Sequence, residues 1–380
     1  MNGIFIEQVP LQEFCAWEKM RKNKRIFSFE LEVTVRCNNN CRHCFVNLPE
    51  GDQQAKKQEI TFKQIRAIVD STVRSGALWC LITGGEPLLR KDFFEIYRYL
   101  KQKGLLVSVF TNATLITAAH AELFRKYPPR DIEVTVYGVT KDTYERVTRK
   151  KGSFPAFMRG LQLLWKENIK VRLKAMIMRS NLKESSAIAK FCRLHSKDFF
   201  RFDPFLYFRH DGNSLRNEEI RSERLTPEEI VKLETEDPER SKALESSCNT
   251  MVSLWRAGNQ DNRIFSCGIG AGAFFVNYKG RLRLCSSLTH PECSYVFNVR
   301  GSAKLFQETL PRVLAMRSNN EKLLNNCLHC IHVNFCGWCP AHAYLETGRL
   351  DGYVPYFCDV AKARVGAFGH RLEKISGKKR

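Results

Sequence analysis

The chain has 380 residues, 43% of them hydrophobic, and its formal net charge is +21, so it can form one large domain and a smaller one. No stretch approaches the roughly 20 apolar residues of a membrane helix, and the N-terminus lacks the apolar run of a signal peptide. We therefore expect a cytoplasmic protein without a membrane partner, whose positive surface suits nucleic acid, an acidic peptide, a redox protein or another anionic surface.

The first predicted strand covers residues 27 to 36, where apolar and polar side chains alternate, and it leads directly into Cys37-Asn-Asn-Asn-Cys41-Arg-His-Cys44. In a reducing compartment, closely spaced cysteines indicate a metal site rather than disulfides. Three thiolates are one ligand too few for a structural zinc site. They can, however, bind three irons of a four-iron cluster and leave the fourth iron open.

This motif resembles the Cys-x3-Cys-x-aromatic-Cys signature of the radical S-adenosylmethionine (SAM) superfamily, with His43 at the aromatic position. The resemblance implies a [4Fe-4S] cluster on Cys37, Cys41 and Cys44, whose open iron chelates the methionine end of SAM. One electron from the cluster then breaks a carbon–sulfur bond and gives a 5′-deoxyadenosyl radical. His43 is accordingly expected beside the cofactor.

Strand and helix patterns then alternate, which predicts an α/β fold with a parallel sheet, flat or curled into a partial barrel, and a ligand site at the carboxyl ends of the strands. The resemblance implies the curled form, a partial (β/α)6 TIM-like barrel. The later strands are predicted at 78–83, 105–110, 132–136, 171–178 and 199–208, and the helices at 62–74, 92–103, 118–125, 156–166 and 183–194.

The second strand ends in Thr83-Gly84-Gly85-Glu86-Pro87. Glycines allow a close approach of the backbone to a ligand, and a glutamate accepts hydrogen bonds from an ammonium group. By itself the segment is equally compatible with an ordinary turn. Next to the cysteine motif it resembles the family's motif for the SAM amino group, which implies that Gly84, Gly85 and Glu86 bind the cofactor.

The third and fourth strands also end in polar residues. Phe110-Thr111-Asn112-Ala113 is similar to a Thr-Asn-Gly that many members carry, with Ala113 in place of the glycine. Thr135 stands where relatives often have a serine that contacts the SAM ribose. The resemblance assigns Asn112 and Thr135 to the cofactor site, and the alternative is that both only cap the helices that follow.

The sixth strand leads into a polar stretch that contains Asp203 and Tyr207, which we take as candidate catalytic residues. A polar rim without a catalytic role is the alternative. Residues 211–247 are charged and poor in aromatics, which is typical of a linker. Within it Thr226-Pro-Glu-Glu229 has the sequence of a helix start.

The C-terminal third is rich in cysteines, and its Cys-x2-Cys pairs indicate either zinc or iron–sulfur clusters. Their order resembles the SPASM domain of radical SAM enzymes, which holds auxiliary [4Fe-4S] clusters. The resemblance implies one or two such clusters. Auxiliary cluster I is assigned Cys267, Cys285 and Cys339, and auxiliary cluster II is assigned Cys327, Cys330, Cys336 and Cys358.

The fourth ligand of auxiliary cluster I stays open at this stage. Either Cys248 or Cys293 folds back to the cluster, or one iron is left free to bind substrate. The remaining cysteines, Cys15, Cys80 and Cys192, are expected in the apolar core. The patterns divide the chain into an N-terminal segment (1–26), the barrel (27–210), the linker (211–247), the SPASM domain (248–370) and a basic tail (371–380).

A radical SAM site with auxiliary clusters suits a reaction in which the substrate radical loses an electron, such as oxidation or cross-linking. Residues 336–348 and 354–358 look similar to SPASM proteins that modify ribosomally made peptides, so we expect a peptide substrate. Because few residues precede the first strand, a separate leader-binding carrier protein is expected, together with a reductant such as flavodoxin or ferredoxin.

Three other functions are alternatives to peptide modification. A SPASM enzyme of cofactor or tetrapyrrole biosynthesis fits the same motifs. Formylglycine formation, as in sulfatase maturases, is disfavoured because Ser286 stands where those enzymes carry an aspartate base. A zinc-ribbon nucleic-acid-binding protein leaves the three-cysteine motif unexplained, so nucleic acid is not expected as a partner.

Overall fold

The computed structural model of the chain describes residues 26–198, 200–246, 262–297, 301–327, 330 and 332–368. Its main sheet runs in the order β11-β10-β9-β1-β4-β5-β6-β7-β8. From β1 to β8 every neighbouring pair is parallel, which confirms the predicted parallel arrangement. These six barrel strands are β1 (Ser28–Thr34), β4 (Trp79–Gly84), β5 (Leu106–Thr111), β6 (Asp131–Val136), β7 (Arg172–Met176) and β8 (Arg201–Asp203).

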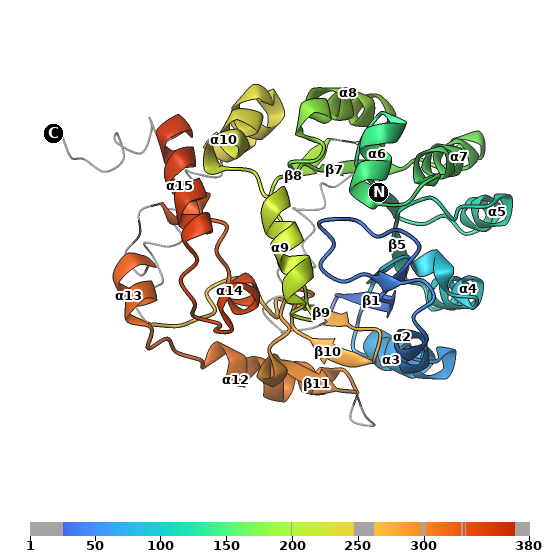
Figure 1. Cartoon of the computed structure of the whole chain (residues 1–380). Helices are drawn as coiled ribbons and strands as arrows, with labels where there is room; N and C mark the ends of the chain where they lie inside the picture. The colour runs from blue at the N-terminus through green and yellow to red at the C-terminus, as the bar shows by residue number, and fades with distance from the viewer. Residues whose placement is uncertain are drawn as a thin grey trace, which may run out of the picture.

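The crossover helices form an arc around the outside of the strands, so the chain forms the expected partial barrel (Figure 1). Local sequence sets where these helices begin. Thr61, for example, forms a capping box with Gln64 at the start of α3. The helices of this part are α2 (Gln53–Gln58), α3 (Phe62–Arg74), α4 (Phe93–Gln102), α5 (Ala118–Lys126), α6 (Lys141–Thr148), α7 (Ser153–Lys166) and α8 (Ser185–His195), with short 3-10 turns η2 (Pro87–Leu89) and η3 (Leu182–Glu184).

The barrel core lies between the strands and these helices. In β1 the alternate residues Phe29, Leu31 and Val33 are buried in the main hydrophobic cluster. Burying each such side chain stabilises the fold by about 1.5–3 kcal/mol. Because successive side chains of a strand point to opposite faces, Glu30 and Glu32 face the inside of the barrel. The interior of this barrel is therefore lined with ionisable groups.

The cysteine-rich region is joined to the barrel through the sheet. Strand β9 (Ala273–Val276) pairs in parallel with β1, and β10 (Arg281–Arg283) pairs antiparallel with both β9 and β11 (Ser294–Val296). Main-chain hydrogen bonds thus hold the start of this region against the first barrel strand. It continues with η4 (Pro291–Cys293), η5 (Leu305–Thr309), α12 (Leu310–Leu314), α13 (Glu321–Cys327), η6 (Val333–Phe335), α14 (Pro340–Thr347) and α15 (Pro355–Phe368).

The linker contains more helix than was predicted. The helix expected after Thr226 is present as α10 (Pro227–Glu236), with the Thr226 side chain accepting from the Glu229 N–H. It is preceded by α9 (Ser214–Glu223), which was not predicted, and residues 238–246 are also helical. In Figure 1, α9 crosses the front of the molecule and α10 lies beside α15.

The predicted sixth strand, 199–208, was too long. Only Arg201–Asp203 pairs with β7. The next residue is Pro204, which has no N–H to donate, and the chain leaves the sheet there.

Parts of the earlier predictions lie outside the described residues. These are the N-terminal segment up to residue 25, the basic tail 371–380, Cys15 and Cys248. Among the helices that the structure describes, none has the length and apolar character to cross a membrane.

His120 should make stability depend on pH. Its Nδ1 accepts from the Thr117 N–H at 3.3 Å, its ring lies 4.7 Å from that of Phe94, and burial lowers its pKa to about 4. Because the unfolded chain takes up this proton at its usual pKa near 6.5, the stabilisation is complete above pH 6.5 and is lost as the pH falls towards 4. The loss amounts to about 3 kcal/mol.

This effect can be measured by urea unfolding between pH 5 and 8. The difference in unfolding free energy between the parent and His120→Asn should shrink as the pH falls below 6.5. A difference that stays constant over this range would contradict the prediction.

Candidate functional site

Cys37, Cys41 and Cys44 lie on one loop at the carboxyl end of β1. A small parallel sheet of β2 (Arg36–Cys37) and β3 (Leu48–Pro49) closes the base of this loop. Burial raises the pKa of the Cys37 thiol, and the nearby Cys41, Glu86 and Cys44 raise it further. The three thiols therefore lie close together on this loop, with Cys37 and Cys41 buried and Cys44 partly buried.

Three arginines from distant parts of the chain hold this loop. Arg149 donates to the Asn40 carbonyl at 2.8 Å, Arg216 of α9 donates to the Cys41 carbonyl at 2.9 Å, and Arg209 donates to the Cys44 carbonyl at 3.1 Å. Their hydrogen bonds fix the backbone between the thiols. Their positive charges also favour thiolate over thiol, and so favour metal binding.

Gly84 and Gly85 are required by the backbone that they pack against. A Cβ on Gly84 would lie 2.2 Å from the Thr34 carbonyl oxygen, and one on Gly85 would lie 2.3 Å from that of Arg36. Gly84 also has a φ of +154°, which L side chains rarely adopt. These glycines thus bring the end of β4 directly against the start of the cysteine loop.

Glu86 and Asn112 connect the ends of two neighbouring strands. The fully buried Glu86 carboxylate accepts from the Asn112 N–H at 2.7 Å, the Thr111 hydroxyl at 2.8 Å and the Leu88 N–H at 3.1 Å. Burial raises its pKa to about 7, against the effect of these hydrogen bonds. A carboxylate has about four acceptor positions, so one stays available for a ligand donor.

Asn112 itself reaches the cysteine loop. Its side-chain amide donates to Asn38 at 2.9 Å and lies 3.7 Å from the Cys37 sulfur. The following Ala113 has a φ of +62°, in the left-handed region that favours glycine. Alanine here therefore adopts the backbone that a glycine would adopt in the Thr-Asn-Gly version of the motif.

Thr135 and His43 lie close to the same space. Thr135 is on the inner face of β6 and pairs with Lys174 of β7. The His43 ring lies 5.1 Å from the ring of Tyr137, and the Tyr137 hydroxyl hydrogen-bonds the Cys41 thiol. Burial, followed by the charge of Lys174, lowers the pKa of His43 to about 4, so this imidazole is neutral.

The donors at this site fit a cluster with a polar ligand beside it. Three thiols converge there, and three nearby side chains have buried polar atoms with no partner among the described residues: Asn39, His43 (Nδ1) and Tyr144. Buried polar atoms are normally hydrogen-bonded. A bound polar group would supply such partners.

The C-terminal cysteines form two groups. Burial raises the pKa of the Cys327 thiol to about 12, and the nearby Cys336, Cys330 and Cys358 also raise it. In the second group, burial raises the pKa of the Cys339 thiol to about 11, and the nearby Cys285 and Cys267 also raise it. The structure therefore brings together the two sets that the sequence assigned to auxiliary clusters II and I.

Other cysteines lie apart from both groups. Cys80 and Cys192 are buried in the main core, as predicted. Cys293 is fully buried at η4. Burial raises the pKa of its thiol to about 12, Glu292 raises it further and Arg312 lowers it. In the described ranges no three cysteine, histidine or acidic side chains converge on a position for a single metal ion. A four-iron cluster binds each thiolate at a different iron, so its ligands do not have to converge on one point.

Asp203 and Tyr207 lie close together where β8 leaves the barrel. Asp203 accepts from the Phe205 N–H at 2.9 Å, and burial raises its pKa. Tyr207 stacks on His342 with ring centroids 3.6 Å apart, and Asp203 and Cys339 both raise its pKa after burial. Both candidates therefore lie between the barrel and the C-terminal cysteines.

Sequence reasoning missed Lys174 and His342. Lys174 forms an ion pair with Glu133 inside the barrel, and its ammonium lies 4.4 Å from the Phe110 ring centroid. His342 has a buried Nδ1 without a partner in the described part of the chain. For Lys174 the available signal was the alternation of Arg172, Lys174 and Met176 with apolar residues along the strand. Without the pairing of β7 with β6, however, the sequence does not say which face of the strand points into the barrel.

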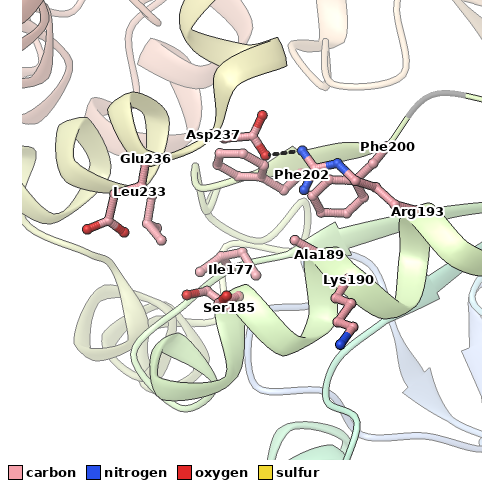
Figure 2. Close-up of a pocket in the computed structure, with 11 residues that line it drawn as sticks. Ile177, Ser185, Ala189, Lys190, Arg193, Phe200, Phe202, Leu233, Glu236 and Asp237 are labelled. Atoms are coloured by element: carbon pink, nitrogen blue, oxygen red, sulfur yellow. Dashed lines mark hydrogen bonds and ion pairs between the residues drawn. The ribbon is translucent and has the colours of Figure 1, made fainter.

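A cavity of about 390 Å³ lies away from these residues, between α8, β8 and α10 (Figure 2). Apolar side chains such as Phe202 and Leu233 line it, and the ion pair between Arg193 and Asp237 lies at its edge. It contains none of the residues that the sequence assigned to a site.

Residues 31–192 match the model of the Radical SAM superfamily. Fe-coproporphyrin III synthase of Methanosarcina barkeri is 31% identical over 156 residues, 41% of this chain and 38% of that protein. AdoMet-dependent heme synthase of Oleidesulfovibrio alaskensis is 23% identical over 83% of each chain. The antilisterial bacteriocin subtilosin biosynthesis protein AlbA of Bacillus subtilis is 29% identical over 42% of this chain and 35% of AlbA. The first and third matches thus span less than half of the relative.

Two solved structures share the fold over most of the chain. The structure of anSMEcpe with bound AdoMet has a TM-score of 0.64 at 15% identity and covers 93% of this chain and 96% of that one. Streptococcus suis SuiB bound to precursor peptide SuiA has a TM-score of 0.59 at 13% identity and covers 88% of this chain and 77% of that one. The shared fold therefore extends beyond the barrel into the C-terminal region.

Proposed function

Since residues 31–192 form a radical SAM domain, we propose that this chain reductively cleaves SAM and uses the resulting 5′-deoxyadenosyl radical to take a hydrogen atom from a substrate. The observation that carries the proposal is the meeting of Cys37, Cys41 and Cys44 with Glu86 at the carboxyl ends of parallel strands. A [4Fe-4S] cluster bound by these thiolates would supply the electron that breaks the carbon–sulfur bond of SAM.

The surrounding residues bind and orient SAM in this proposal. Glu86 has an acceptor position for the SAM ammonium and is held in place by the end of β5. Gly84 and Gly85 bring the β4 turn against the cysteine loop. Thr135, Asn112 and His43 would offer SAM a hydroxyl, an amide and a neutral imidazole.

We propose a ribosomally made peptide as the substrate, modified by oxidation or cross-linking. Two observations support it. The fold is shared along most of the chain with a protein solved in complex with its precursor peptide, and AlbA, a bacteriocin biosynthesis protein, is a relative. The net charge of +21 suits an acidic peptide, delivered directly or by a carrier protein.

The proposal includes auxiliary clusters in the C-terminal region, and with them a SPASM domain within residues 248–370. One set of thiols, Cys327, Cys330, Cys336 and Cys358, provides four ligands. An auxiliary cluster would accept the electron that the substrate radical loses on oxidation. In this proposal Asp203, whose pKa is raised by burial, takes up the proton released there, and Tyr207 orients the substrate.

A second candidate is tetrapyrrole chemistry, because the AdoMet-dependent heme synthase match covers 83% of each chain. The two functions differ in the molecule that loses a hydrogen atom. Formylglycine formation is not proposed, since Ser286 follows Cys285 and a serine hydroxyl is a poor base.

The experiment compares SAM cleavage by the reduced, anaerobically purified protein with different substrates. We expect 5′-deoxyadenosine to accumulate faster with peptides encoded by short reading frames beside the gene than with iron-coproporphyrin III. Deuterium placed in the modified side chain should then appear in 5′-deoxyadenosine. Stimulation by the tetrapyrrole alone would replace the peptide assignment, and an absence of any SAM cleavage would refute the function.

A further inference from the structure

A cavity of about 310 Å³ lies where the barrel meets the cysteine-rich region. Its lining includes Cys267, Cys285 and Cys339, the three thiols assigned to auxiliary cluster I. One more side chain of a type that binds metals lines the same cavity, and it comes from the barrel: Glu30 of β1. The cavity thus has four ligand-type groups from four separate parts of the chain.

Sheet pairing brings Glu30 to this cavity. Strand β9 pairs in parallel with β1, so Glu30 lies opposite Phe275. On the outer face of the same two strands, the rings of Phe29 and Phe274 stack at 5.8 Å, which leaves Glu30 on the inner face. The hairpin that begins with β9 continues through β10 to Cys285.

Within the described part of the chain, the Glu30 carboxylate has no compensating partner. It is half-buried and makes no hydrogen bond or ion pair with any residue that the structure describes. It lines the same cavity as the Cys285 thiol. Placing an unpaired carboxylate beside three thiols is costly unless a cation lies among them.

We propose that Glu30 provides the fourth protein ligand of auxiliary cluster I, through a carboxylate oxygen on the iron that Cys267, Cys285 and Cys339 leave free. This inference rests on the proposed function, which supplies the cluster. Carboxylates are established ligands of iron in proteins. An oxygen ligand in place of a fourth thiolate changes the electrostatic environment of the cluster, and with it the reduction potential.

The sequence offered Cys248 and Cys293 as the fourth ligand of auxiliary cluster I, and the structure disfavours Cys293. Cys293 is buried at η4, next to Glu292 and Arg312, and does not line the cavity. Cys248 lies outside the described residues. The experiment must therefore compare Glu30 directly with Cys248.

The test uses the full chain with Cys37, Cys41 and Cys44 replaced by alanine, so that only auxiliary clusters remain. After anaerobic reconstitution, Glu30→Ala should lose about one iron per chain and show the paramagnetic resonance signal of a three-iron cluster. Glu30→Cys should restore the four-iron form with a shifted reduction potential. The matched control is Glu32→Gln, since Glu32 lies on the same face of β1 and its carboxylate already accepts from the Tyr278 N–H at 3.1 Å.

Two results from the variants would overturn the assignment. One is an unchanged iron content and spectrum in Glu30→Ala, and the other is the appearance of the three-iron signal in Cys248→Ala instead. If the variant with Cys37, Cys41 and Cys44 replaced by alanine binds no iron at all, auxiliary cluster I is absent and the assignment of Glu30 fails with it. SAM cleavage by the unmodified protein is measured separately, so the proposed function can survive the failure of this inference.

Discussion

Replacing Cys41 with alanine is expected to abolish SAM cleavage. Cys41 is buried between Cys37 and Cys44, its carbonyl is held by Arg216, and its thiol is hydrogen-bonded by Tyr137. Loss of a partner that only supports a metal ligand costs about 10- to 100-fold in activity or affinity. Loss of the ligand itself should exceed that range, because a cluster with two thiolates would not remain bound.

The measurement is 5′-deoxyadenosine formed per chain under reducing conditions, together with the iron content. Cys41→Ala should lose about four irons while the auxiliary clusters persist. The control is Cys192→Ala, which removes a fully buried thiol from α8 and should keep both iron and activity. Normal SAM cleavage by Cys41→Ala would rule out the assignment of this loop.

Much of the barrel was predictable because local sequence and tertiary structure agree there. The helix expected at 62–74 is α3, with those bounds, since its apolar residues are regularly spaced and Thr61 caps it. Helix α6 was missed although Thr140 caps it, because its short, polar sequence gives a weak pattern. The predicted sixth strand was too long because Phe205 to Phe208 continue the apolar pattern after Pro204. There Phe205 packs against Phe357 of the C-terminal region, and Leu206 and Phe208 join a separate cluster with Met178 and Ile220.

The closeness of the residues assigned to the cofactor was predictable for a different reason. Cys37, Glu86 and Asn112 each follow a parallel strand, and the carboxyl ends of parallel strands meet at one edge. Glu30 could not be found this way, because its surroundings depend on the pairing of β1 with β9, almost 250 residues later in the chain. His342 was missed for a similar reason, because it stacks on Tyr207, which lies far from it in the sequence.

The ion pair between Glu234 and Arg364 should be the strongest polar contribution to the junction between linker and C-terminal region. Arg364 of α15 donates to the Glu234 carboxylate of α10 at 2.7 and 2.8 Å, and to the Phe335 carbonyl at 2.9 Å. Both side chains are buried, with exposures of 5% and 0%. The Arg364 guanidinium also lies 4.9 Å from the Phe205 ring centroid.

Glu234→Leu should therefore lower the free energy of unfolding by about 3–5 kcal/mol, because it leaves a buried guanidinium without a counter-charge. The double variant Glu234→Leu with Arg364→Met should recover much of that loss, since an apolar pair of similar volume needs no desolvation of charge. Urea unfolding under anaerobic conditions measures both. As a comparison, Arg193→Ala breaks an ion pair with Asp237 at a more exposed position and should cost less than about 1 kcal/mol. A similarly small loss in Glu234→Leu would mean that apolar packing between α10 and α15, and not this ion pair, holds the linker to the C-terminal region.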